Sequence, residues 1–277
     1  MRNKYNIKIY KTMEVLDSLE KAITDKESFS LIRFGDGGIK LIHSYFYSDD
    51  KQLDLIVEKE GIPRDKIKNL LDLWTISAST ADFVDTPAVY FQDDFWPRVK
   101  GHKNMSQKTI DRLKMWKRIY EIANFDIQKY CNPEVNFLSC LDIFEERGFP
   151  NCLKNKKFCI ITSREDMHNV LKDYNFDLVI VPGFTNYQYR VFPRVLNKIK
   201  NDAKNYDLWL VAAGELGRIY SGLIKFHGGV SFDIGSTIDF WLTKIIPLRL
   251  NQYIGVSLED DMRVTLIGEG KKYRDFI

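Results

Sequence analysis

The strongest constraint on the fold is a repeated alternation, between about residues 156 and 246, of short apolar runs and longer segments with helical periodicity. The apolar runs, which we expect to be strands, cover residues 157–162, 177–181, 207–213 and 229–234. They are apolar at consecutive positions, which is typical of strands buried on both faces of a parallel sheet. The pattern therefore predicts an α/β fold in which a mostly parallel sheet is flanked by helices.

The first half of the chain is richer in helical patterns. We expect helices over 10–24, 38–47 and 106–124 and two more within 50–74, strands over 28–34 and 75–80, and mostly loop over 82–104. No low-complexity linker or internal repeat divides the sequence, so we expect a single Rossmann-like domain over residues 1–277. Within it we expect a helix-rich part to about residue 150, the alternating part over about 156–246, and a C-terminal extension over 247–277.

Composition argues against several classes of protein. The four cysteines show no Cys-x-x-Cys spacing and have no histidine cluster beside them, which argues against a zinc site. The formal net charge of +3 is too small to indicate a nucleic-acid partner. No apolar run approaches the roughly 20 residues of a membrane span, and the first residues lack an apolar signal core. We therefore expect a cytoplasmic protein with reduced thiols and no transmembrane segment.

The segment best suited to chemistry follows the first expected strand. Arg33, Gly35, Asp36, Gly37 and Gly38 stand where an apolar run ends and a helical pattern begins. The glycines permit a sharp turn and a close approach of a ligand to the backbone. Open α/β sheets bind ligands at the carboxyl ends of their strands, and an arginine with a carboxylate there suits a free or metal-bound diphosphate. The alternative is a tight turn in which Asp36 only caps the helix.

The string Arg33-Phe34-Gly35-Asp36-Gly37 resembles the signature of the bacterial GT-D fold glycosyltransferases, which continues with a glutamate. Gly38 stands at the position of that glutamate. The resemblance covers about residues 8–245, and this string is its specific part. It implies that residues 33–38 bind a nucleotide-diphosphate sugar. It also implies that Asp36 is a catalytic residue that binds Mn²⁺ or Mg²⁺, cations that prefer oxygen ligands.

A second candidate segment joins the third apolar run of the alternating part to the next helix. It contains Gly214, Glu215, Leu216, Gly217 and Arg218. Free backbone N–H groups at a helix start attract a phosphate or a ribose, so we expect these residues to bind the nucleotide-sugar donor. Glu215 carries a carboxylate and is a candidate base. The segment lacks the glycine patterns of dinucleotide sites and of phosphate-binding loops. An ordinary strand–helix connection is an equally good interpretation.

A third candidate segment follows the last apolar run. Asp233 ends that run, Ser236 is a natural N-cap, and Asp239 lies in the helical pattern that follows. The GT-D family closes its core with a similar Asp-Ile-Gly string, so the resemblance implies donor contacts for Gly235 and Ser236. Asp233 and Asp239 are candidate catalytic carboxylates. Asp233 has the alternative role of a hydrogen-bonded carboxylate that holds the turn.

The resemblance implies a glycosyltransferase of the hexosyltransferase type, with a UDP-sugar as the expected donor. The implied acceptor is a glycan, a glycoprotein or a lipid-linked glycan, and a homodimer and a position at the inner face of a membrane are further expectations. Because Gly38 replaces a carboxylate, three alternatives stay open. Asp36 binds the cation more weakly, it shares the cation with Glu215 or Asp233, or Arg33 and Arg218 act without a cation. Two other classes stay open: a relative that binds nucleotide sugar or glycan without turnover, and another Rossmann-like enzyme with a nucleotide cofactor.

Overall fold

The computed structural model describes residues 9–10, 12–33, 36–46, 50–85, 129–131, 153–183, 188–235 and 238, and for residues 36–40 it describes the backbone. The helices are α1 (Thr12–Asp25), α2 (Asp36–Phe46), α3 (Asp50–Glu60), α4 (Ile67–Thr80), α9 (Met167–Val170), α10 (Phe192–Asp202) and α11 (Gly214–Phe226), with the 3-10 turns η1 (Arg64–Lys66), η4 (Gln188–Val191) and η5 (Ala203–Asn205). The strands are β1 (Ile9–Tyr10), β2 (Phe29–Arg33), β3 (Phe83–Asp85), β4 (Tyr130–Cys131), β5 (Lys157–Thr162), β6 (Asn175–Ile180), β7 (Leu208–Ala212) and β8 (Val230–Asp233).

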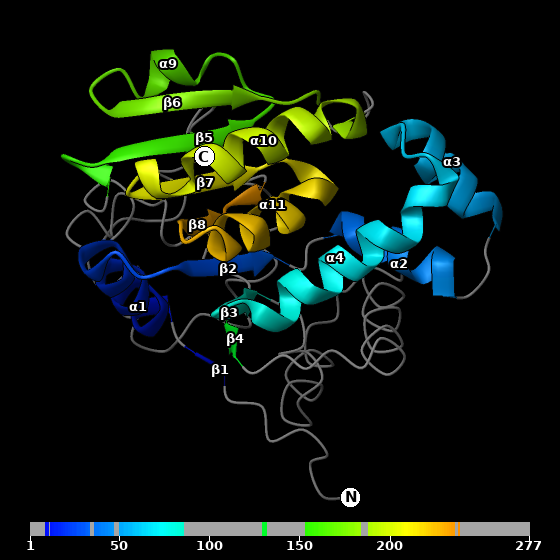
Figure 1. Cartoon of the computed structure of the whole chain (residues 1–277), viewed down its shortest axis with the longest axis horizontal. Helices are drawn as coiled ribbons and strands as arrows, with labels where there is room; N and C mark the ends of the chain where they lie inside the picture. Colours follow the sequence, from blue (N-terminus) through cyan, green and yellow to red (C-terminus); the bar gives the residue numbers. More distant parts are fainter. Residues whose placement is uncertain are drawn as a thin grey trace, which may run out of the picture.

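The strands form one eight-stranded sheet in the order β1-β4-β3-β2-β8-β7-β5-β6 (Figure 1). Each strand pair in it is parallel. The sheet joins the two halves of the chain, because β2 pairs with β8 and aligns Leu31 with Phe232. Parallel strands need crossover connections, which the helices supply. The α/β fold class, with a mostly parallel sheet flanked by helices, is confirmed.

Both faces of the sheet are buried. On one face, Leu31 of β2 and Ile160 of β5 belong to a core cluster that includes residues of α1 and α9. On the other face, Ile32 and Ile161 belong to a second cluster with α2, α4, α10 and α11. Successive residues of a strand point to opposite faces, so a strand buried on both faces must be apolar at consecutive positions. This is the pattern by which the sequence predicts these strands.

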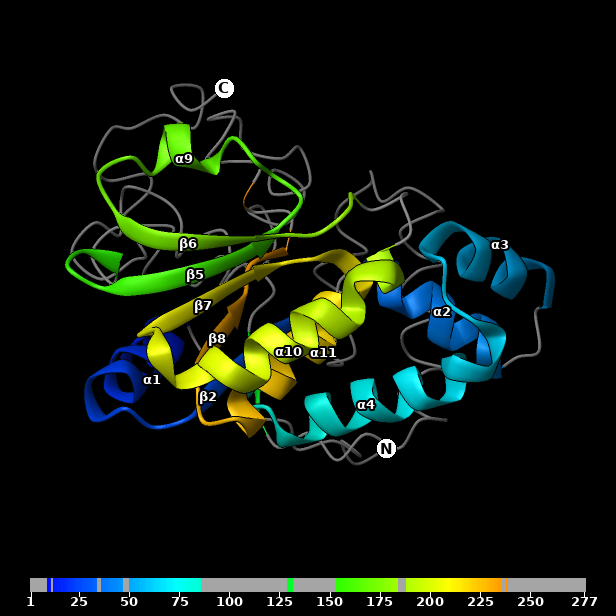
Figure 2. The same cartoon turned by 45° about the horizontal axis from the view of Figure 1, so that its top comes forward.

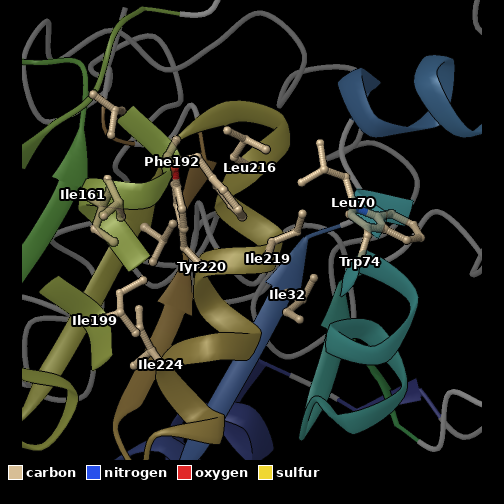
Figure 3. Packing of buried hydrophobic residues seen from close by; sticks show 14 of the residues in the cluster. Ile32, Leu70, Trp74, Ile161, Phe192, Ile199, Leu216, Ile219, Tyr220 and Ile224 are labelled. Carbon is tan, nitrogen blue, oxygen red and sulfur yellow. The ribbon is translucent and has the colours of Figure 1, made fainter. Parts of the chain in front are cut away.

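Helices α4, α10 and α11 lie side by side on the second face, with α11 in the middle (Figure 2). Figure 3 shows side chains of α11 between those of α10 and α4, namely Leu216, Ile219 and Tyr220 of α11, Phe192 and Ile199 of α10, and Leu70 and Trp74 of α4. Gly222 permits a close approach of α4, because a Cβ atom there would lie 2.4 Å from Cβ of Ser77. Burial on both flanks fixes the position of α11, and with it the residues at the start of this helix.

The expected strand over 75–80 is wrong, because these residues continue α4. Leu71, Trp74 and Ala78 are buried at helical spacing, and Ser77 beside them packs against α11. This helical stripe outweighs the β-branched residues of the segment. The expected loop over 82–104 is also wrong at its start, since Phe83–Asp85 forms β3. The rest of that loop, the expected helix over 106–124 and the extension over 247–277 lie outside the described residues.

No helix in the described part of the chain combines the length and the apolar character that crossing a bilayer requires.

Candidate functional site

Charged side chains gather where three neighbouring strands end. Arg33 ends β2, Asp85 ends β3 and Asp233 ends β8. The sheet order places β2 between β3 and β8, and the register aligns Arg33 with Asp85. Helix α11 begins at Gly214, just after β7, at the same edge of the sheet. These ends form the candidate site, at the edge where open α/β sheets bind ligands.

Arg33 links the ends of all three strands through its side chain and its backbone. Its Nε donates to Oδ2 of Asp85 at 3.2 Å, which is also an ion pair. Its Nη1 donates to the carbonyl oxygen of Ile234 at 3.2 Å, and its backbone N–H donates to Oδ2 of Asp233 at 3.3 Å. An arginine with a planar fork of donors is well suited to hold two strand ends at once. Arg33 therefore fixes the geometry of the strand ends that precede the glycine-rich turn.

Gly235 makes the position of Arg33 possible. Its φ of +48° lies in the left-handed region, and a Cβ atom there would lie 2.1 Å from Nη1 of Arg33. The backbone N–H of Gly235 donates to Oδ1 of Asp233 at 3.1 Å. Asp233 therefore accepts from the backbone on both oxygens and holds the turn after β8. The structural role considered for Asp233 is confirmed.

Arg218 joins the start of α11 to the end of β2. Its Nε donates to the carbonyl oxygen of Arg33 at 2.6 Å. Its Nη1 donates to Oε2 of Glu215 at 3.0 Å, an ion pair in which the two side chains are 6% and 8% exposed. The same nitrogen contacts the carbonyl oxygen of Gly214 at 3.4 Å. Arg218 therefore joins the start of α11 to the residue at the end of β2, just before the glycine-rich turn.

Burial dominates the electrostatics of the site. It raises the pKa of Asp85 to about 7, although the Arg33 guanidinium beside it acts in the opposite direction. Burial likewise raises the pKa of Asp233 and of Glu215, opposed by Arg218 as the next largest influence. Among the described residues, three buried carboxyl groups thus lie beside two guanidinium groups, and burial opposes the ionisation of each carboxyl group. Such an arrangement is common at functional sites.

The structure brings several of the predicted site residues together. Arg33, Gly214, Glu215, Arg218, Asp233 and Gly235 share hydrogen bonds or ion pairs at this edge. Asp36, Gly37 and Gly38 are the first three residues of α2, and two residues separate this helix from the end of β2. Leu216 and Gly217 are buried in the first turn of α11, where Leu216 belongs to the core. Phe34, Gly35, Ser236 and Asp239 lie outside the described residues.

Asp85 is a site residue that the sequence analysis missed. It ends a short run, Phe83-Val84-Asp85, of apolar residues closed by a carboxylate. Phe232-Asp233 at the end of β8 has the same form. A short apolar run closed by a carboxylate is therefore a sequence signal that could have identified Asp85.

The described carboxylates do not fit a divalent cation. Oδ2 of Asp85 accepts from Arg33, and both oxygens of Asp233 accept backbone N–H groups. Among the described side chains, no group of three or more His, Cys, Asp or Glu residues lies together as metal ligands would. The side chain of Asp36 is not among them.

Comparisons with known proteins agree with this fold. The family model of the GT-D fold-like domain matches residues 10–241. A solved structure described as domain of unknown function 1792, with a distinct glycosyltransferase fold, superposes with a TM-score of 0.54 at 20% identity over 91% of each chain. A selenomethionine form of domain of unknown function 1792 gives 0.55 at 19% identity over 91% of each chain. A glycosyltransferase from Streptococcus sanguinis gives 0.54 at 16% identity over 86% of this chain and 85% of that one. No curated protein matches the sequence.

Proposed function

This chain belongs to the family of GT-D fold-like domains, and on that premise we propose that it is a glycosyltransferase that moves a sugar from a nucleotide-diphosphate sugar to a hydroxyl group of a glycan. The glycosyltransferase fold of the similar structures supports the reaction class. The UDP-sugar donor, the glycoprotein or lipid-linked acceptor, transfer of a hexose, a homodimer and a cytoplasmic or membrane-peripheral location rest on the sequence resemblance alone.

The observation that carries the proposal is the convergence of Arg33, Arg218 and two helix starts at one edge of the sheet. Helix α2 begins at Asp36 and α11 begins at Gly214, each just after a strand of the sheet ends. Backbone N–H groups in the first turn of a helix attract anions, and the helix dipole adds to this. A leaving nucleoside diphosphate gains negative charge as the glycosidic bond breaks. Fixed dipoles and guanidinium groups in a buried setting stabilise such charge.

The acceptor hydroxyl must lose a proton as it attacks the sugar. A carboxylate beside that hydroxyl is suited to accept it. Burial raises the pKa of Asp233 and of Glu215, and both lie at the site edge. Asp36 and Asp239 are candidates by sequence. We assign the base to this set of carboxylates, and single substitutions with measurement of kcat will identify it.

A thermal-shift screen tests the donor. The protein is heated with UDP-, GDP-, CMP- and dTDP-sugars, each with Mn²⁺ and with EDTA. A ligand at 100 times its Kd stabilises the native state by about 2.7 kcal/mol, which gives a clear rise in Tm. We expect one nucleotide sugar to raise the Tm. The rise is lost in Asp36→Ala and kept in Glu58→Ala, which removes an exposed carboxylate of α3. The EDTA arm tests the cation expected at Asp36. No rise with any donor would contradict the proposal.

Binding without turnover is a second candidate, favoured by Gly38 in place of the family's glutamate. It predicts a donor that raises Tm but is neither hydrolysed nor transferred. Chromatography can measure the release of free nucleoside diphosphate with and without a glycan acceptor. This release distinguishes a glycosyltransferase from a protein that only binds the donor. Any catalysed release above the rate of Asp36→Ala supports the enzyme.

A further inference from the structure

Asp85 ends β3 on the same face of the sheet as the side chain of Arg33. Leu31 and Phe83, which lie two residues earlier in β2 and β3, are aligned across the sheet and belong to the core cluster that includes residues of α1. Side chains two residues apart in a strand share a face. The register also aligns Arg33 with Asp85, and their side chains are 16% and 5% exposed. Strand register thus sets the contact between them, and burial shields it from water.

The strand beyond β3 offers Arg33 a much poorer acceptor. Strand β4 pairs with β3, and the register aligns Asp85 with Cys131, which carries a buried free thiol. A thiol sulfur is only a weak hydrogen-bond acceptor, whereas a carboxylate accepts strongly from a guanidinium group. Among the described strand ends on this side of β2, Asp85 is therefore the acceptor that suits the side chain of Arg33.

The guanidinium group of Arg33 reaches across β2 in both directions. Strands β3 and β8 flank β2 on opposite sides (Figure 1). Nε donates to Oδ2 of Asp85 on the β3 side, and Nη1 donates to the carbonyl oxygen of Ile234 on the β8 side, each at 3.2 Å. The guanidinium is a rigid plane, so the bond at Nε sets the direction in which Nη1 points. Asp85 therefore acts on the turn after β8, from the far side of β2.

We propose that Asp85 is a positioning residue for the donor site: through the guanidinium of Arg33 it holds the end of β2 and the turn after β8 in the arrangement that binds the nucleotide-diphosphate sugar. These are the two segments from which donor contacts are expected, since Asp36 follows the first and Gly235 and Ser236 belong to the second. Asp85 itself needs no contact with the donor. That these segments bind a donor rests on the proposed function, whereas the contacts of Arg33 do not.

A double-mutant cycle on donor binding tests whether Asp85 acts through Arg33. The Kd of the UDP-sugar, or of the nucleotide sugar that the thermal-shift screen selects, is measured by titration calorimetry at a temperature where each variant is folded. We expect Asp85→Ala to raise the Kd about tenfold or more. Asp85→Asn is expected to recover most of this loss, because its amide oxygen still accepts from Nε. In an Arg33→Met background, Asp85→Ala is expected to weaken binding no further.

Two results of the cycle overturn the proposal. One is a Kd of Asp85→Ala equal to that of the wild type. The other is the same loss from Asp85→Ala with and without Arg33→Met, since independent effects add. Gly222→Ala is the control for lost stability alone, because its Cβ would lie 2.4 Å from Cβ of Ser77, about two turns along α11 from the helix start. It is expected to bind the donor as the wild type does, and an equal loss in Gly222→Ala and Asp85→Ala also overturns the proposal.

The Nε–H group of Arg33 reports its positioning in the protein without ligand. In ¹H–¹⁵N spectra, assigned by the signal that Arg33→Lys lacks, we expect this proton to exchange with water roughly tenfold faster in Asp85→Ala than in the wild type. Asp82→Ala, at the other end of β2, is expected to leave the exchange unchanged. Equal exchange in Asp85→Ala and the wild type overturns the proposal.

This exchange measurement separates the proposal from the proposed function. If no nucleotide sugar binds the wild type, the proposed function fails, and the exchange rate alone decides whether Asp85 holds Arg33. Should Asp85→Ala not fold, the wild type decides by comparison with Arg64, whose side chain is 58% exposed. Exchange at the Nε–H of Arg33 that is roughly tenfold slower than at Arg64 supports the proposal, and equal exchange overturns it.

Discussion

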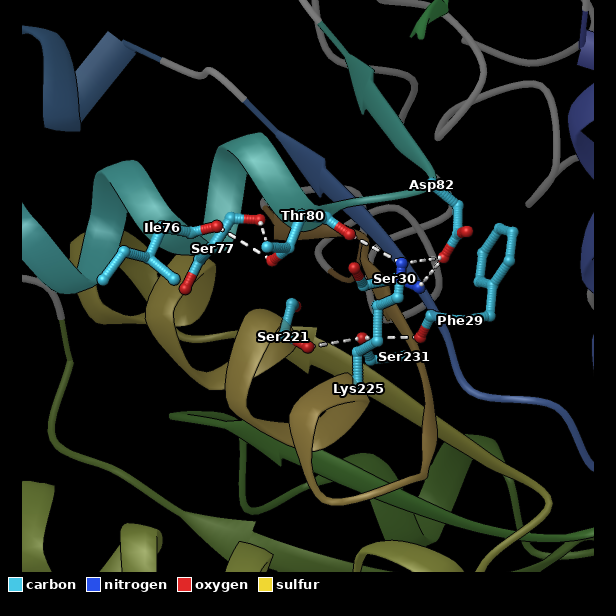
Figure 4. A network of polar contacts seen from close by, with 9 residues as sticks. All are labelled: Phe29, Ser30, Ile76, Ser77, Thr80, Asp82, Ser221, Lys225 and Ser231. Atoms are coloured by element: carbon cyan, nitrogen blue, oxygen red, sulfur yellow. Dashed lines mark hydrogen bonds and ion pairs between the residues drawn. The ribbon is translucent and has the colours of Figure 1, made fainter. Parts of the chain in front are cut away.

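The two ends of β2 differ in how their polar groups are balanced. At the amino end, Oδ2 of Asp82 accepts the backbone N–H of Ser30 at 2.9 Å and pairs with Nζ of Lys225 at 2.8 Å (Figure 4). Lys225 also donates to the carbonyl oxygen of Thr80 at 2.6 Å. Here one carboxylate meets one ammonium group, and their side chains are 28% and 22% exposed. At the carboxyl end, three buried carboxyl groups of the described part of the chain lie beside two guanidinium groups.

This difference separates a structural contact from a functional site. A balanced and partly solvated ion pair costs the fold little and joins α11 to the strand that follows α4. Burying several carboxyl groups beside one another costs stability, and proteins retain such groups where they serve binding or catalysis. Both ends are held by the same helix, α11, through Lys225 near its end and Arg218 near its start. Substitutions of Lys225 and of Arg218 on this one helix can therefore compare the two ends of β2.

The largest effect is expected for Arg218→Met. The change leaves Glu215 buried without its ion-pair partner and removes the donor to the carbonyl oxygen of Arg33. We expect the free energy of unfolding to fall by about 3–5 kcal/mol, measured by urea denaturation. The double variant Arg218→Met/Glu215→Gln removes both charges and is expected to recover a large part of this loss. A double variant no more stable than the single one would contradict the pairing.

The next largest effect is expected for Gly235→Ala. The added Cβ would lie 2.1 Å from Nη1 of Arg33, and the residue has a φ of +48°. We expect a loss of about 1–3 kcal/mol together with loss of the donor-induced rise in Tm. Gly183→Ala is the matched control, because a Cβ there meets nothing within 4 Å. If the two variants behave alike, the close contact with Arg33 is not a constraint on the site.

The pH dependence of stability is expected to be smaller but measurable. Because burial raises the pKa of Asp85 to about 7, the folded chain keeps a proton that the unfolded chain has released. Each pH unit over which one such group is protonated only in the folded state lowers the free energy of unfolding by about 1.4 kcal/mol. Urea denaturation should show higher stability at pH 5 than at pH 7.5, with a shallower slope in Asp85→Asn. Stability that rises over this range would contradict the burial of these groups.

The smallest effect is expected at the amino end. Lys225→Met removes a partly exposed ion pair, and we expect a loss of about 1 kcal/mol or less. It leaves the donor-induced rise in Tm unchanged, because Lys225 lies near the opposite end of α11 from Arg218. The comparison with Arg218→Met in the same buffer is the check. Equal losses of unfolding free energy in Lys225→Met and Arg218→Met would remove the distinction between the two ends of β2.

Sequence periodicity predicted the strands of the alternating part because burial on both faces requires consecutive apolar residues. It predicted a strand over 75–80, because Thr75, Ile76 and Ser77 have β-forming or small side chains. These residues are helical in the structure, because the packing of α4 against α11 decides their conformation. The local sequence also identified Arg33, Asp233 and Glu215 as candidate site residues, each within its own segment.

The pairing of these residues was beyond the sequence. The contact of Arg33 with Asp85 and that of Arg218 with the carbonyl oxygen of Arg33 join residues 52 and 185 positions apart. Such contacts depend on strand order and register, which apolar patterns do not specify.

Titration calorimetry of the UDP-sugar, or of the donor that the screen selects, tests the central claim most directly. The titration is made with the wild type, with Asp36→Ala at the carboxyl end of β2 and with Asp82→Ala at its amino end. The account predicts equal Kd values for the wild type and Asp82→Ala, and a Kd at least tenfold weaker for Asp36→Ala, which is a loss of about 1.4 kcal/mol. Equal binding by all three proteins, or weaker binding by Asp82→Ala alone, would contradict a donor site at the carboxyl ends of the strands.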